Sequence, residues 1–116
     1  METIERNASE FRQYLSQIGY KRKSVVIKAA ETVTLHDLNW SGGTRAEYSV
    51  FTIDGQYVSN TLPYSALAPW ANRAEGAKLP IPEGFIVVEH GCFCGKPARA
   101  HIYVHPANMP KLLTAA

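Results

Sequence analysis

The stretch FIVVEHGCFCGKPARAHIYVH, residues 85–105, contains two β-branched apolar runs on either side of a Gly-Lys-Pro turn, a pattern typical of a β-hairpin. The length of the turn sets which residues face each other across the hairpin. A two-residue turn pairs Cys94 with Pro97, which has no N–H to complete the closing pair of hydrogen bonds. A three-residue turn pairs Cys94 with Ala98, Cys92 with Ala100 and His90 with Ile102. We predict the three-residue turn, because it separates apolar from polar side chains.

In the predicted register each face of the hairpin has one character, since side chains alternate along a strand. The apolar face carries Ile86, Val88, Cys92, Cys94, Ala98, Ala100, Ile102 and Val104. The other face carries Glu89, Phe93, Arg99, His101, Tyr103 and His105. The cysteines are then buried thiols. The cationic and aromatic stripe suits a ligand or a partner, so we predict a binding surface of Phe93, Arg99, His101, Tyr103 and His105.

A metal site is the alternative interpretation of the same segment. His90, Cys92, Cys94 and His101 are residue types that zinc prefers, and a four-residue turn would place Cys92 opposite His101. The spacing argues against this site, because structural zinc usually takes cysteines two to four residues apart. We therefore predict no cofactor, with zinc as the minority alternative. A catalytic cysteine is less favoured still, because no base or helix N-terminus activates the thiol.

Working outward, the rest of the chain predicts one helix and further strands. Asn7 and Glu10 form a capping box, an apolar stripe follows at helical spacing, and Gly19 ends the helix. Asp54-Gly55 predicts a second hairpin between Tyr48–Ile53 and Gln56–Asn60, in which Phe51 pairs with Val58. Short helical turns are expected at residues 64–71, interrupted by Pro69, and at 107–113.

These elements predict a single α+β domain over residues 1–116: a mostly antiparallel sheet of five to six strands with an N-terminal amphipathic helix. Both faces of the second hairpin carry bulky side chains, which is more apolar surface than one short helix covers. This surplus is the reason to predict a homo-oligomer.

Two further segments offer weaker candidates for binding. The loop Ser41-Gly42-Gly43-Thr44-Arg45 could present N–H groups and Arg45 to an anion, although it lacks the pattern of a P-loop. Lys21-Arg22-Lys23 is a basic cluster, and with the Arg99–His105 stripe it could form a nucleic-acid-binding surface. The formal net charge of only +2 keeps nucleic acid as an alternative.

Composition excludes several classes of protein. The chain has 116 residues, of which 46% are hydrophobic and 19% charged, which is typical of a globular domain. No apolar run is long enough to cross a membrane, and the first residues do not resemble a signal peptide. Two cysteines one residue apart do not form a disulfide framework. We therefore expect a cytoplasmic protein.

Trp40–Arg45 with Tyr48, and Phe93–Lys96 with Ile102–Pro106, resemble segments of small phage and prophage proteins. The resemblance implies an accessory protein of a mobile element, acting on a host system, and assigns no catalytic residue. Together these observations predict a non-catalytic binding protein whose partner is a host protein or a small anionic ligand. A small enzyme centred on the Cys/His segment stays an alternative.

Overall fold

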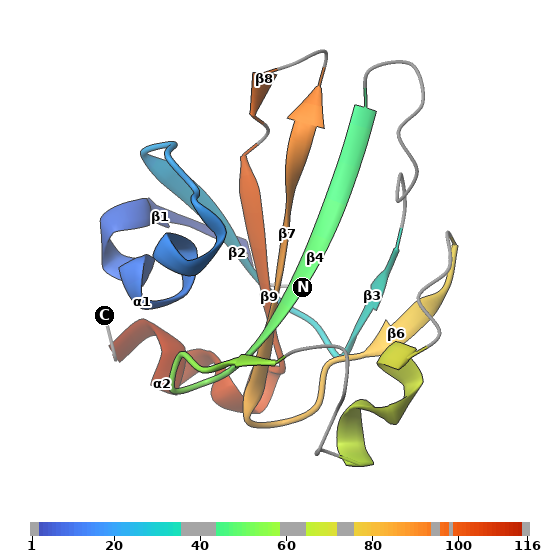
Figure 1. Cartoon of the computed structure of the whole chain (residues 1–116). Coiled ribbons are helices and arrows are strands. Elements are labelled where there is room, and N and C mark those ends of the chain that lie inside the picture. Colours follow the sequence, from blue (N-terminus) through green and yellow to red (C-terminus); the bar gives the residue numbers. More distant parts are fainter. Residues whose placement is uncertain are drawn as a thin grey trace.

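A computed structural model describes residues 3–35, 44–58, 65–71, 76–93, 96–97 and 99–114. Within these residues one sheet has the strand order β1-β2-β9-β7-β4-β5, and β8 pairs with the end of β7 (Figure 1). Its strands are β1 (Thr3–Asn7), β2 (Ser24–Ala29), β4 (Thr44–Thr52), β5 (Tyr57–Val58), β7 (Phe85–Phe93), β8 (Lys96–Pro97) and β9 (Ala100–Val104). The β2–β9 pair is parallel and the other neighbours are antiparallel. The predicted α+β fold with a mostly antiparallel sheet is confirmed.

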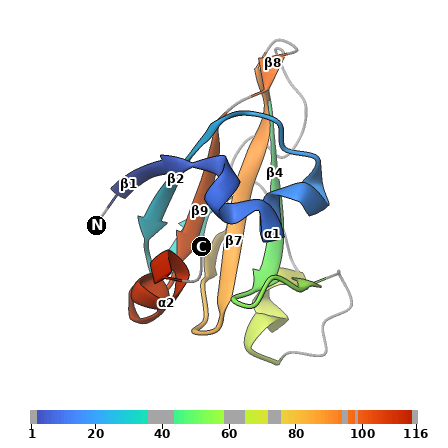
Figure 2. The same ribbon diagram turned by 90° about the vertical axis from the view of Figure 1, so that its left-hand side faces the viewer.

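One face of the sheet, here called the helix face, is covered by the helical segments of both chain ends (Figures 1 and 2). They are the 3₁₀ turns Ala8–Phe11, Ser16–Ile18 and Pro106–Asn108 with the helices α1 (Arg12–Leu15) and α2 (Met109–Thr114). The core between them and the sheet contains Phe11, Tyr14, Leu15, Val25, Ile27, Phe51, Ile86, Val88, Ile102, Val104, Met109 and Leu112. Helices from opposite ends of the chain therefore share one core.

The second face packs against a smaller sheet, β3 (Thr32–Thr34) with β6 (Lys78–Pro80), and against the 3₁₀ segment Ser65–Ala71. This segment contains Pro69, as the sequence predicts. The core on this second face of the sheet includes Val33, Leu35, Val50, Val58, Leu67, Trp70, Leu79, Ile81 and Val87. Among the described residues Tyr57 is the one large exposed hydrophobic side chain. Both faces are thus covered within one chain, which accounts for the apolar bulk that motivated the oligomer prediction.

The predicted N-terminal helix is present between its expected limits, although much of it is 3₁₀. The Asn7 N–H donates to Glu10 Oε2 at 3.3 Å, and Gly19 ends the segment with φ of +69°. Phe11, Tyr14 and Leu15 are buried, as their spacing predicts. Strand β1, which precedes the helix, was not predicted, because Thr3–Asn7 is a short polar segment.

The hairpin at Asp54-Gly55 forms, but its predicted register is wrong by one residue. Val50, and not Phe51, lies opposite Val58, and the Thr52 N–H donates to Gln56 O at 2.8 Å. Three residues therefore form the loop in place of two. As a result Val58 joins Val50 on the second face, while Phe51 lies on the helix face.

Strand β7 has the predicted bounds, but the predicted three-residue turn after it is wrong. Phe93 lies opposite Lys96 and Cys92 opposite Pro97, so two residues separate the strands. Further down, Glu89 lies opposite His101. Between these two pairs β7 advances by three residues, from Glu89 to Cys92, whereas the opposite segment advances by four, from Pro97 to His101. One extra residue in a strand is the signature of a bulge.

Candidate functional site

The structure brings three of the predicted binding residues together on the second face of the sheet. Arg99 precedes β9, and His101 and Tyr103 follow it at alternate positions. His105 lies past the other end of the strand, where its Nδ1 accepts a hydrogen bond from Ala107 N at 3.1 Å. It serves there as a helix cap and is not part of this group. The side chains of Arg45 and Phe93 lie outside the described residues.

A buried carboxylate, Glu89 of β7, organises this part of the face. It is 7% exposed, and its Oε2 accepts a hydrogen bond from the Tyr48 hydroxyl at 2.6 Å. Its Oε1 lies 2.8 Å from His101 Nδ1 and accepts from the Tyr103 hydroxyl at 3.3 Å. We call Glu89, Tyr48, His101 and Tyr103 the Glu89 cluster. Three donors from the two flanking strands, β4 and β9, compensate the buried negative charge.

The cluster fixes the tautomer of the neutral His101 ring. A carboxylate only accepts hydrogen bonds, so Nδ1 must carry the proton that it shares with Glu89. In the neutral ring Nε2 is then the basic nitrogen. Within the described residues Nε2 has no hydrogen-bond partner, and the side chain is 32% exposed. His101 therefore presents a lone pair at the surface from a fixed ring.

Tyr103 stays a hydrogen-bond donor in this arrangement. Burial, and then the neighbouring charge of Glu89, raise the pKa of its hydroxyl above the ordinary value. Its ring stacks edge-on against His101 at a centroid distance of 6.3 Å, and Lys28 Nζ lies 5.5 Å from the ring centroid. Tyr103 thus contacts the His101 ring and the Lys28 ammonium group.

Cations gather at the end of the sheet where β2 and β9 begin. Because these strands are parallel, the turn Lys21–Lys23 before β2 lies at the same end as Arg99 before β9. Tyr20 joins them, since its hydroxyl donates to Ser24 O at 2.7 Å and accepts from Ala100 N at 3.0 Å. We call Lys21, Arg22, Lys23 and Arg99 the basic end. All four side chains are exposed.

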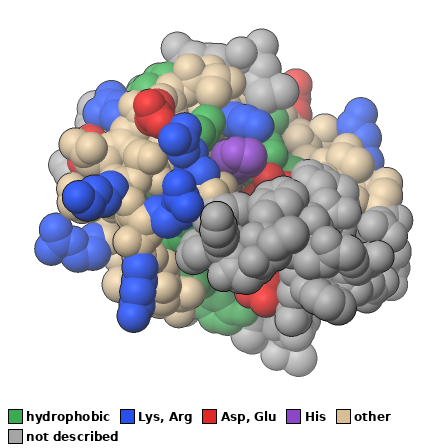
Figure 3. Space-filling model, turned by 90° about the horizontal axis from the view of Figure 1, so that it is seen from above, with side chains coloured by type: hydrophobic (Ala, Val, Ile, Leu, Met, Phe, Trp, Pro, Cys, Tyr) green, Lys and Arg blue, Asp and Glu red, His purple; other side chains and the backbone are tan. Residues whose placement is uncertain are grey.

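Figure 3 views the molecule from this end and shows Lys and Arg side chains gathered on one side, with a histidine beside them. A cavity of about 200 Å³ opens there, and its lining holds Arg12, Lys21 and Arg22 but no acidic residue. Arg99 also forms an exposed ion pair with Glu5 at 2.6 Å. The two basic groups that are far apart in the sequence, Lys21–Lys23 and Arg99, thus lie at one end of the sheet.

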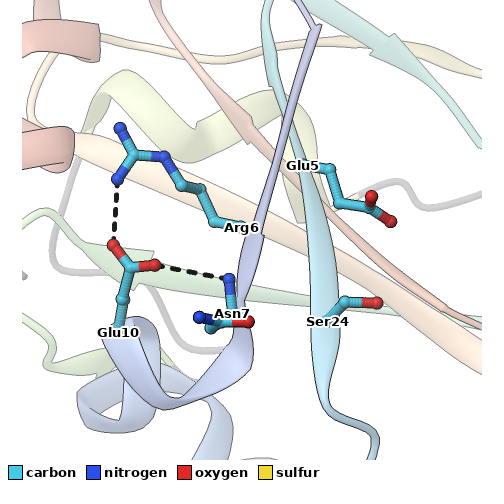
Figure 4. Close-up of a pocket in the computed structure, with 5 residues that line it drawn as sticks. All are labelled: Glu5, Arg6, Asn7, Glu10 and Ser24. Atoms are coloured by element: carbon cyan, nitrogen blue, oxygen red, sulfur yellow. Dashed lines mark hydrogen bonds and ion pairs between the residues drawn. The ribbon is translucent and has the colours of Figure 1, made fainter.

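A larger cavity of about 400 Å³ is lined by Glu5, Arg6, Asn7, Glu10 and Ser24 (Figure 4). Arg6 and Glu10 face each other there, with Nη1 and Oε1 2.9 Å apart. The second oxygen of Glu10 accepts from the backbone of Asn7. The lining of this cavity has two carboxylates and one cation, so it suits an anion less well than the basic end does.

The predicted metal ligands do not converge. His90 lies on the helix face, where its Nε2 is 3.2 Å from Ser49 Oγ, whereas His101 lies on the second face. Burial lowers the pKa of His90, against an opposing effect of Glu47. Cys94 and the side chain of Cys92 lie outside the described residues. Among the described residues no group of three His, Cys, Asp or Glu side chains could hold a metal ion.

Sequence reasoning placed Glu89 on this face but missed its central role, and it missed Tyr20, Tyr48 and Lys28. The available signal was an acidic residue inside the apolar run of β7. No helix in the described part of the chain is long and apolar enough to cross a membrane. Comparison with known proteins gives no match to a family model, to a curated protein or to a solved structure.

Proposed function

We propose that this protein is a binding module for a phosphate-bearing ligand, which it takes at the basic end. The observation that carries the proposal is the bridge made by the Tyr20 hydroxyl between Ser24 O and Ala100 N. It holds the turn Lys21–Lys23 against the start of β9, where Arg99 lies. Two basic groups that the sequence separates therefore act on one ligand.

The arrangement suits phosphate for three reasons. Guanidinium and ammonium groups are the common partners of phosphate oxygens. The cavity beside the turn has three cations and no acid in its lining. Of the nearby acids, Glu10 pairs with Arg6, and Glu5 pairs with Arg99 in an exposed ion pair, so a phosphate at Arg99 takes the place of Glu5. A ligand with more than one phosphate could contact the turn and Arg99 together.

The phosphate could belong to a nucleotide or to a nucleic acid strand, and the experiment separates these sources. Fluorescence anisotropy with a labelled 12-nucleotide single strand is measured at several salt concentrations, and calorimetry is run with ATP and with inorganic phosphate. The test variant is Lys21→Ala with Lys23→Ala. Lys78→Ala is the control, because Lys78 is an exposed cation on β6.

Each exposed contact contributes a few tenths to about 1 kcal/mol to the binding free energy. The loss of two contacts in the double variant should therefore weaken binding by roughly 3- to 30-fold. For a strand, the slope of log K against log salt should fall by about 1.4. Binding of ATP without the strand would identify a small ligand. Absence of binding to all three probes at low salt would overturn the proposal, as would equal loss in Lys78→Ala.

A host-protein partner, which the resemblance to phage proteins implies, stays a prediction. The same is true of the homo-oligomer.

A further inference from the structure

We infer that the Glu89 cluster is a proton-transfer site at which His101 acts as a general base on RNA bound at the basic end. This inference rests on the proposed function, because it takes the phosphate-binding surface as the means of holding the strand. It adds an activity that the binding proposal does not contain: cleavage of RNA by attack of its own 2′-hydroxyl.

The geometry of His101 is that of an oriented base. Glu89 holds Nδ1 at 2.8 Å, and its other oxygen is held in turn by Tyr48. The lone pair therefore lies on Nε2, the nitrogen that has no partner among the described residues. Histidine is the side chain best suited to take up a proton near pH 7. A carboxylate behind it stabilises the cation that forms when it does so.

The structure also favours a substrate that brings its own nucleophile. Among the described residues no serine, threonine or cysteine is hydrogen-bonded to His101, so the site offers no side chain for covalent attack. RNA supplies a 2′-hydroxyl next to each phosphodiester. Cations lie on both sides of the base along the face: Arg99 two residues before His101, and Lys28 beside Tyr103. They can hold the phosphate whose negative charge increases during attack.

The proposed step balances as follows. His101 Nε2 takes the proton from the 2′-hydroxyl, the 2′-oxygen forms a bond to phosphorus, and the bond from phosphorus to the 5′-oxygen breaks. The leaving 5′-oxygen takes a proton from water, and His101 later returns its proton to solvent. The products are a 2′,3′-cyclic phosphate and a 5′-hydroxyl. No electron transfer occurs, and water is the co-reactant.

The test uses the whole chain with a labelled single-stranded RNA, the same sequence as DNA, and a 2′-O-methyl RNA that cannot be cleaved. Products are resolved by gel and by mass, which identifies the cyclic phosphate. His101→Gln keeps a donor for Glu89 but cannot act as a base. Glu89→Gln probes positioning, and His105→Gln is the matched histidine control outside the cluster. Circular dichroism and thermal unfolding report whether each variant folds.

We expect RNA, but not DNA, to be cleaved. His101→Gln should lower kcat by roughly 10²- to 10⁴-fold, while affinity for 2′-O-methyl RNA stays within about twofold, since the remote basic contacts persist. Glu89→Gln should lower kcat by at least tenfold with the same retained affinity, a split that a purely structural role would not give. Because His105 lies outside the cluster, His105→Gln should keep the kcat and the RNA affinity of the unsubstituted protein, even where loss of the cap on Ala107 N lowers its Tm.

Three outcomes would overturn the inference. If the protein binds 2′-O-methyl RNA but does not cleave the unmodified strand, the proposed activity is wrong and the proposed binding function stands. If His101→Gln cleaves RNA as fast as the unsubstituted protein, His101 is not the base. If DNA is also cleaved, or if every variant gives the same products, the activity belongs to a contaminating nuclease. If no strand is bound, both the proposed activity and the proposed phosphate-binding function are wrong. If His101→Gln fails to fold, Glu89→Gln and His101→Asn are scored by the same criteria.

Discussion

Replacing Tyr20 by phenylalanine tests the link between the basic turn and the sheet without changing any charge. The ring stays, but the hydroxyl that donates to Ser24 O and accepts from Ala100 N is lost. Ala100 is fully buried, so its N–H loses an acceptor where water cannot easily replace it. An unsatisfied buried donor costs about 1–3 kcal/mol. For a chain of this size we expect a fall in Tm of about 4–12 °C.

Thermal and urea unfolding followed by circular dichroism measure the loss, and anisotropy with the labelled strand measures binding. Tyr57→Phe is the matched control, because the Tyr57 side chain is 49% exposed and no hydrogen bond of its hydroxyl is seen among the described residues. Tyr20→Phe should weaken both stability and binding, whereas Tyr57→Phe should change neither by more than about 0.5 kcal/mol. A Tyr20→Phe protein as stable as the unsubstituted one would refute the reasoning about the bridge.

Two further predictions concern His90 and the state of the chain in solution. Burial lowers the pKa of His90 in the folded protein below the ordinary value of 6.5, so the unfolded chain binds more protons as pH falls from about 6.5. The stability that neutral His90 contributes is therefore complete above that pH and is lost below it, with a slope of at most about 1.4 kcal/mol per pH unit. Urea unfolding between pH 5 and about 8 should show this acid limb, and His90→Gln should flatten it; an unchanged limb would contradict the assignment. Native mass spectrometry of protein purified without chelator tests the predicted homo-oligomer as peaks at multiples of 12.8 kDa with no added mass. A bare monomer would contradict the oligomer, and a zinc-sized increment would contradict the absence of a cofactor.

The faces of the 85–105 hairpin could be predicted from the sequence, although its pairing could not. The true pairs are displaced from the predicted ones by two residues at Glu89, and an even displacement keeps the side chains of this part of the hairpin on their predicted faces. At Cys92 the displacement is three residues. Ile86, Val88 and Ile102 therefore lie in the core as predicted. At Asp54-Gly55 the displacement is one residue, which moved Val58 to the other face.

The candidate site was only partly predictable, because its contacts depend on pairing. The alternation of Arg99, His101 and Tyr103 along the strand was enough to predict that these three side chains share one face of the sheet. The predicted register placed Glu89 opposite Tyr103, whereas the extra residue between Pro97 and His101 brings it opposite His101. The parallel pairing of β2 with β9 joins segments about two-thirds of the chain apart, and no local pattern marks it. The bridge made by Tyr20 depends on that pairing, so it could not be predicted from the sequence either.

The strand order has a consequence for how the chain is made. β9 lies inside the sheet between β2 and β7, yet it is the last of the described strands to leave the ribosome. Until it arrives, β2 has no partner on its inner edge, and the N-terminal helical segment has only part of its core. Contacts so distant in sequence form slowly, because a long loop must close first. The sheet is therefore completed only after Val104 has been synthesised, and the edges of β2 and β7 that pair with β9 stay unpaired until then.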